Sequence, residues 1–219
     1  MSLQLFAHPF SSYCQKAFIA FYENDLAFEL RMLSQEEPAN FEELTRRWPM
    51  KRFPILVDGD RTIVEATSII EYLEAYYPGK VRLIPTDARA AVEVRMMDRV
   101  FDTYVMTPQG NIVFNAIRPP EVRDAHGEKG WRAMLETSYA WLNERMSGRT
   151  WAVGEQFSLA DCAAAPSLFY ADWTHPIDKR FSALHDYRQR LLARPSFARA
   201  VDGGRPYRSY FPLGAPDRD

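Results

Sequence analysis

The segment 53–73 constrains the fold most, because its pattern predicts a strand, a tight turn, a second strand and a helix in direct succession. Two short β-branched runs, 55–57 and 62–64, flank the tripeptide Asp58-Gly59-Asp60. An Asp-Gly pair between two such runs is a strong signal for a β-hairpin. Pro54 has no N–H to give to a ladder, so it must stand at the entry of its strand. That position leaves the N–H and C=O of the preceding Phe53 free to pair with an extended ligand.

The pattern changes from strand to helix between Glu65 and Ser68. Ser68 and Glu71 have the spacing of a capping box, and the following apolar residues recur at helical intervals. Backbone N–H groups at a helix start attract a carboxylate, while the side chain of Glu65 attracts an ammonium group. A site that offers both kinds of contact suits the α-amino-acid end of a peptide.

The N-terminal half alternates strand and helix. We expect strands at 3–6 and 27–32, with a helix over 11–22 between them and a second helix over 40–48. Two strands joined through a helix are expected to be parallel. With the segment 53–73, the order is β-α-β-α-β-β-α, which is the thioredoxin-like pattern of an α/β domain.

From Asp87 onward the apolar spacing is helical and no strand is predicted. We therefore expect an α/β thioredoxin-like domain over 1–80 and an all-helical domain over 87–219. Ser158 and Asp161 have capping-box spacing and are expected to begin the central helix. The remaining helices are expected over 87–115, with a bend near 107–110, and over 128–146, 180–193 and 196–202, followed by an irregular tail from 203.

Two serines, Ser11 and Ser12, stand where the first strand ends and a helix begins. The positive end of the helix dipole lies there, and a thiol placed at it has its thiolate form favoured. A hydroxyl that donates a hydrogen bond to the sulfur favours the thiolate further. The chain can therefore activate the thiol of a cosubstrate without supplying a nucleophile. The alternative is that one serine merely caps the helix, and both roles can coexist in the pair.

Composition excludes several classes. A net charge of −2 over 219 residues gives no electrostatic case for a nucleic-acid or anionic-membrane partner. Two cysteines are too few for a disulfide framework, and no segment resembles a signal peptide or a membrane span. The four histidines show no metal-ligand spacing. We expect a cytoplasmic protein without a metal.

Together these motifs resemble the cytosolic glutathione S-transferase family, in its bacterial, serine-containing form. The run Ser11-Ser12-Tyr13-Cys14 is similar to Ser-Ser-Pro-Cys of the delta class and to the corresponding motifs of the theta and zeta classes. The resemblance implies glutathione as cosubstrate, with Ser11 as the catalytic residue at its sulfur and Ser12 as the alternative. It also implies that Pro54 follows a cis peptide bond.

The same resemblance assigns the remaining contacts to glutathione. Glu65 holds the γ-glutamyl end, although the family's next residue, a serine, is Ala66 here, and either Lys51 or Arg52 pairs with the glycine carboxylate. It further implies a homodimer and a site for a small hydrophobic electrophile between the domains. The residues expected at the tripeptide are Phe10, Arg52, Phe53, Pro54, Glu65 and Ala66, and those expected at the electrophile are Phe10, Phe101, Tyr104, Val105, Phe169, Tyr170 and Trp173.

Three functions remain open on the sequence. The first is a glutathione transferase that adds the thiolate to an electrophile. The second is a glutathione-dependent isomerase of the maleylacetoacetate type, or a thiol-disulfide reductase using Cys14. The third is a non-catalytic glutathione-binding or scaffold protein of the same fold, which Ala66 in place of serine keeps open.

Overall fold

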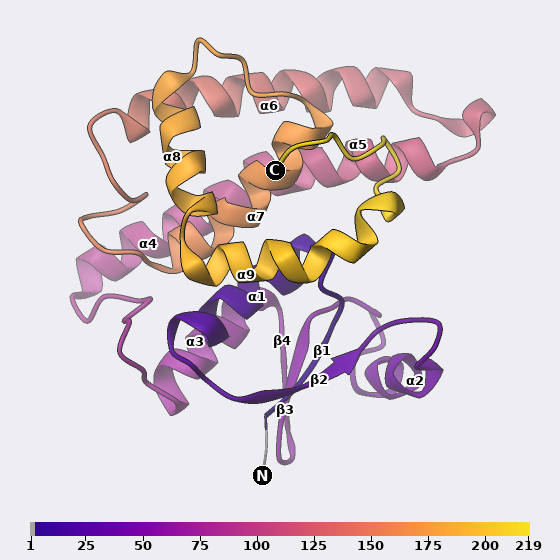
Figure 1. Ribbon diagram of the computed structural model, residues 1–219, viewed down its shortest axis with the longest axis vertical. Helices are drawn as coiled ribbons and strands as arrows, with labels where there is room; N and C mark the ends of the chain where they lie inside the picture. Colours follow the sequence, from indigo (N-terminus) through magenta and orange to yellow (C-terminus); the bar gives the residue numbers. More distant parts are fainter. Residues whose placement is uncertain (1–2) are drawn as a thin grey trace.

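A computed structural model describes residues 3–219 of the chain (Figure 1). A mixed sheet lies at one end of the molecule and a layer of helices at the other, and α1 lies between them. The strands follow the order β2-β1-β3-β4 across the sheet. They are β1 (Leu3–Ala7), β2 (Phe28–Met32), β3 (Ile55–Asp58) and β4 (Arg61–Val64).

The pairing of the strands confirms the predicted pattern. β1 and β2 are parallel, whereas β3 is antiparallel to both β1 and β4. Asp58 pairs with Arg61 at the end of the hairpin, and Gly59 in the turn has a φ of 58°, a conformation that glycine adopts without steric cost. The Phe53–Pro54 peptide bond is cis, as the resemblance implied.

The helices occupy the predicted segments with small shifts. α3 begins at Ala66, so the predicted start at Ser68 was wrong, and Glu65 is the residue before the helix. The bend was predicted near 107–110, but these residues belong to α5, and the irregularity lies earlier, in a π-helical turn over Phe101–Met106. The tail, which was predicted to be irregular, contains a 3₁₀ helix. The bounds are α1 (Ser12–Glu23), α2 (Pro38–Arg47), α3 (Ala66–Tyr76), α4 (Ala88–Val100), η1 (Phe101–Met106), α5 (Thr107–Ile117), η2 (Pro120–Val122), α6 (Ala125–Met146), α7 (Leu159–Thr174), α8 (Ser182–Leu192), α9 (Pro195–Gly204) and η3 (Arg205–Tyr210).

Helix α7 is the centre of the helical layer, and every one of its residues is buried. The predicted capping box begins it, since Asp161 accepts a hydrogen bond from the backbone N–H of Ser158 at 2.9 Å. The same carboxylate also accepts from the N–H of Ala152 at 2.9 Å and from the hydroxyl of Tyr187 at 2.6 Å. Asp161 therefore ties the start of α7 to a loop and to α8. Limits at residues 80 and 87 for the two domains stay a prediction.

A buried cluster of charges joins the two halves of the chain. Lys16 on α1 is 1% exposed, and its Nζ lies 2.6 Å from a carboxylate oxygen of Asp98 on α4 and 2.7 Å from one of Asp102 on η1. The ammonium group also donates to the hydroxyl of Thr67 at 2.9 Å, and that hydroxyl donates to Asp98 at 2.9 Å. An ammonium group without these partners could not be buried here, because desolvation alone costs several kcal/mol. None of the helices described between residues 3 and 219 is long and apolar enough to cross a membrane.

We expect Lys16→Met to lower the free energy of unfolding by about 3–5 kcal/mol, because it leaves two buried carboxylates without their cation. Urea denaturation followed by circular dichroism measures this loss. The matched control is Arg95→Met, because the pair between Arg95 and Glu71 also joins the two halves at 2.6 Å but is exposed. That variant should lose about 1 kcal/mol or less. Equal losses in the two variants would contradict the importance of the buried cluster.

Candidate functional site

A cleft of about 600 Å³ lies between the sheet domain and the helical layer. It brings together residues from the turn between β1 and α1, from the segment before β3 and from the start of α3, and these segments are far apart in sequence. All eight site residues predicted from the sequence line this cleft: Phe10, Ser11, Ser12, Arg52, Phe53, Pro54, Glu65 and Ala66. Their individual roles stay predictions.

Ser11 is the residue before α1, but its side chain makes no capping hydrogen bond. Its hydroxyl lies close enough to the Cys14 thiol to lower the pKa of that thiol, and the thiol accepts a hydrogen bond from the N–H of His8 at 3.5 Å. Ser12 is the first residue of the helix and faces the same cleft. Both hydroxyls therefore stand at the positive end of the α1 dipole, free of the capping role that the sequence allowed them.

Cys14 itself is fully buried. Burial raises the pKa of its thiol to about 12, although the hydrogen bonds from Ser11 and from the His8 N–H partly oppose this shift. A thiol in this state is protonated at neutral pH and out of reach of a disulfide. The structure thus gives Cys14 a packing role, and it disfavours a redox role.

Phe53 lines the cleft, and its backbone is not paired with any of the strands described within residues 3–219. The pairing of β3 with β1 begins at Ile55, so Phe53 stands outside the ladder just before the cis bond. Its backbone is positioned to pair with an extended ligand, as the sequence predicted. The two residues before Phe53, Lys51 and Arg52, are cationic and line the cleft as well.

Two cleft residues have backbone conformations that L-amino acids rarely adopt. Glu65 has a φ of 67° and Lys51 has a φ of 55°. Such conformations cost about 1–3 kcal/mol each and concentrate at functional sites. The strain directs one carboxylate and one ammonium group to the same cleft. The N–H groups at the start of α3 follow Glu65 immediately, so acceptors and donors for a zwitterionic group lie side by side.

The sequence reasoning missed Asp102, whose carboxylate does not line the cleft but lies close enough to Glu65 for the two negative charges to interact. Burial raises the pKa of the nearby Tyr13 phenol, and the negative charges of Asp102 and Glu65 raise it further. Lys16 neutralises only one of the two carboxylates Asp98 and Asp102. A surplus of negative charge therefore remains beside Glu65. Asp98 and Asp102 are four residues apart and fall among the apolar positions Val94, Met97, Phe101 and Val105, and this was the signal that could have revealed a buried cation.

The far wall of the cleft differs from the predicted electrophile site. Phe101 and Val105 are fully buried and do not reach the cleft, and Phe169 and Trp173 pack in the core. Tyr104 is exposed elsewhere. Phe10 and Tyr170 do line the cleft, and the Tyr170 hydroxyl donates to the Phe10 carbonyl at 2.8 Å. The apolar wall comes instead from the last residue of the π-helical turn, from α5 and from the tail: Met106, Val113, Phe114, Ile117, Tyr210, Phe211 and Pro212.

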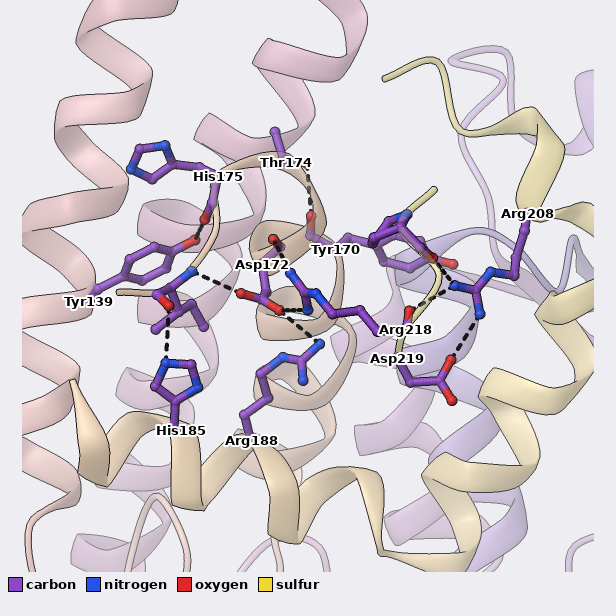
Figure 2. A network of polar contacts seen from close by, with 12 residues as sticks. Tyr139, Tyr170, Asp172, Thr174, His175, His185, Arg188, Arg208, Arg218 and Asp219 are labelled. Atoms are coloured by element: carbon purple, nitrogen blue, oxygen red, sulfur yellow. Dashed lines mark hydrogen bonds and ion pairs between the residues drawn. The ribbon is translucent and has the colours of Figure 1, made fainter. Parts of the chain in front are cut away.

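A buried polar network fixes this tail (Figure 2). The carboxylate of Asp172 on α7 lies 3.2 Å from the guanidinium of Arg188 and also binds the guanidinium of Arg218. Arg208 on η3 donates to the carboxylate of Asp219 at 3.1 Å and to the carbonyl of Arg218 at 2.7 Å. The end of the chain is thus tied to the centre of the helical layer, and η3 is held where its last residue reaches the cleft.

Within residues 3–219, no group of three His, Cys, Asp or Glu side chains is placed to hold a metal ion.

The comparisons with known proteins agree with this geometry. The profile of the glutathione S-transferase N-terminal domain matches residues 5–81, and that of the C-terminal domain matches residues 89–190. A probable maleylacetoacetate isomerase of Vibrio cholerae is 27% identical over 94% of this chain and 98% of its own length. Glutathione S-transferase GstB of Escherichia coli is 24% identical over 87% of this chain and 93% of its own length.

Solved structures show the same fold. A glutathione S-transferase of Methylobacterium radiotolerans, in complex with glutathione sulfonate, superposes with a TM-score of 0.80 at 27% identity, over 92% of this chain and 95% of that one. The chain belongs to the glutathione S-transferase family.

Proposed function

We propose that this protein is a glutathione transferase that activates the thiol of glutathione for attack on a small hydrophobic electrophile. The observation that supports this most is the convergence in one cleft of all eight residues that the sequence pattern assigned to glutathione. The relative of known structure that binds glutathione sulfonate supports the same ligand.

In the proposed complex the γ-glutamyl ammonium binds Glu65, and the excess negative charge of Asp102 strengthens this contact. The γ-glutamyl carboxylate accepts from N–H groups at the start of α3. Ala66 lacks the hydroxyl of the family's serine, but its backbone N–H belongs to that helix start. The cysteinyl backbone pairs with Phe53, and either Lys51 or Arg52 binds the glycine carboxylate.

The reaction proceeds at the sulfur beside Ser11. The hydroxyl donates to the thiolate, which lowers the pKa of the bound thiol, and the thiol proton passes to water. The thiolate then forms a C–S bond with the electrophilic carbon, and the leaving group departs with the electron pair of the bond that breaks. The apolar wall that includes Val113, Phe114 and Phe211 excludes water and holds the hydrophobic part of the electrophile.

An isomerase is the second candidate, and the Vibrio cholerae relative favours it. Maleylacetoacetate carries two carboxylates, so its site requires cationic side chains beyond those that hold glutathione. Among the described residues that line the cleft, Lys51 and Arg52 are the only cations, and glutathione brings two carboxylates of its own. This charge balance favours a transferase. The cytoplasmic location inferred from the sequence stays a prediction.

We expect Glu65→Gln to weaken glutathione binding by about 1–3 kcal/mol, because the amide keeps the shape but removes a charge-assisted contact to the ammonium group. Isothermal titration calorimetry measures this change. Glu155→Gln, at an exposed residue outside the cleft and outside α3 and α4, is the matched control and should bind glutathione as the wild type does. Unchanged affinity in Glu65→Gln would remove this residue from the site.

We expect Ser11→Ala to leave glutathione affinity almost unchanged and to raise the pKa of the bound thiol by about one to two units, because the hydroxyl acts on the ionised sulfur. Turnover of a chloronitrobenzene near neutral pH should fall roughly tenfold to a hundredfold. An ultraviolet thiolate scan of the complex measures the pKa. Ser12→Ala should cost less activity. Loss of activity in Cys14→Ala with none in Ser11→Ala would instead indicate cysteine-based reduction.

We also propose a homodimer formed through α3 and α4. Val92 and Met96 lie one turn apart on α4 and are 65% and 45% exposed, and Tyr76 at the end of α3 is 56% exposed. Large apolar side chains gathered on neighbouring helices are typical of a contact surface.

Light scattering should therefore give about twice the chain mass of 25.4 kDa. Met96→Glu should shift the protein toward the monomer, because it places like charges against each other at the interface. Val122→Glu, at an equally exposed apolar residue outside these helices, is the control. A monomeric mass for the wild type at micromolar concentration would refute the dimer.

A further inference from the structure

Ser11 also lines a second hollow of the molecule. It is a groove of about 1090 Å³ between the segment from β2 into α2 on one side and η3 on the other, and we call it the α2 groove. Phe10, Ser11, Phe53 and Tyr210 line both the cleft and the α2 groove. A substrate whose reacting carbon lies at the sulfur beside Ser11 can therefore extend from the cleft into this groove.

Aromatic rings form much of the lining. His8 packs edge-on against Tyr207 at a centroid distance of 4.6 Å and lies 6.3 Å from the ring of Tyr210. Phe41 at the opposite side belongs to α2 and is 41% exposed. Rings on two sides suit a flat or cationic group, because the negative faces of aromatic rings attract cations.

The groove carries negative charge only. Glu36 and Glu42 line it, no lysine or arginine is among its described lining residues, and neither glutamate forms an ion pair within residues 3–219. His8 does not offset this charge at neutral pH. Its Nδ1 accepts from the N–H of Phe10 at 3.1 Å, and burial lowers the pKa of the ring. The cleft, by contrast, is lined by charges of both signs, Lys51 and Arg52 at one place and Glu65 at another.

The wall formed by η3 is fixed before any ligand arrives. Arg208 is anchored by the carboxylate of Asp219 (Figure 2). Its guanidinium also lies over the ring of Trp173, 4.8 Å from the ring centroid. Tyr207 and Tyr210 therefore flank an anchored residue in the sequence of η3. A preorganised wall contributes to specificity, because less entropy is lost when the substrate binds.

We propose that the α2 groove selects the second substrate by charge, accepting aromatic electrophiles that carry a cationic substituent and rejecting anionic ones. This proposal rests on the transferase function proposed above. The aromatic rings hold the substituent, and Glu36 and Glu42 supply the counter-charge. The step itself is unchanged: the sulfur bonds to the ring carbon, the carbon–halogen bond breaks, the halide leaves and the thiol proton passes to solvent.

Three matched electrophiles test the proposal: para-chloro-meta-nitrobenzamide, its N-(trimethylammonioethyl) derivative and its N-(carboxyethyl) derivative. Their reacting rings are alike and their net charges are zero, positive and negative. For the wild type, kcat/KM for the cation should exceed that for the anion by about tenfold or more, and the ratio should shrink at high salt. In the double variant Glu36→Gln/Glu42→Gln the ratio should fall to within about threefold, while the neutral amide reacts as before.

The control is Glu121→Gln/Glu155→Gln, which removes two exposed carboxylates outside both hollows and should keep the wild-type ratio. Turnover of the neutral amide without any charge preference would overturn the groove proposal and leave the transferase intact. The same ratio in the Glu36/Glu42 variant as in the wild type would also overturn it. Failure to turn over all three compounds would count against the transferase function itself, and with it against the groove as a substrate site.

Discussion

The buried ammonium group of Lys16 constrains how the two halves of the molecule can be arranged. An isolated charge at this depth is unstable, so α1 must keep Asp98 and Asp102 within about 3 Å of the lysine. Those carboxylates belong to α4 and to the π-helical turn η1, on the opposite side of the cleft from the sheet. A shift of one half against the other would expose or orphan these charges, so the cluster fixes the separation of the cleft walls.

The same helix that carries Lys16 begins with the two serines, and the same turn that carries Asp102 ends at Met106 in the apolar wall. The charge cluster therefore sets the distance between the sulfur position and the electrophile wall. Its unequal charge also matters. Two carboxylates against one ammonium leave a negative surplus beside Glu65, where an ammonium group of a ligand is favoured. Structure and binding electrostatics thus depend on one set of residues.

The tail is fixed by similar physics at another place. Asp172 is buried in α7 and requires cationic partners, and Arg218 at the far end of the chain supplies one of them. The ion pair between Arg218 and the buried carboxylate of Asp172 fixes the end of the chain, and η3 lies just before that end. The pair therefore helps to hold Tyr210, the last residue of η3, at the boundary between the cleft and the α2 groove. Strain is stored at the opposite wall, in the positive φ angles of Glu65 and Lys51. The site is thereby held rigid from both domains.

The sequence by itself determined the elements whose signals are local. The hairpin around Gly59, the entry position of Pro54, the parallel first strands and the start of α7 at Ser158 followed from turn chemistry, from the missing proline N–H and from capping spacing. The residues at the expected glutathione position were also predicted, because the motifs that carry them are short and continuous. The start of α3 was misplaced, since a capping box at Ser68 competed with the strained turn at Glu65.

Tertiary structure decided everything that joins distant segments. Asp102 reaches the Glu65 end only because Lys16 draws η1 against α1, and no local pattern in either segment specifies that pairing. The sequence predicted Phe101 and Val105 in the electrophile wall, whereas the structure places Met106 and residues of the tail there. Periodicity shows which side chains are apolar, but it does not show which of them are buried in the core and which line a cleft. The cleft contains both cations and a carboxylate, whereas the α2 groove contains carboxylates without a lysine or arginine among its described lining residues. This difference also arises from packing, because the residues of the two hollows are interleaved along the chain and separate only when it folds.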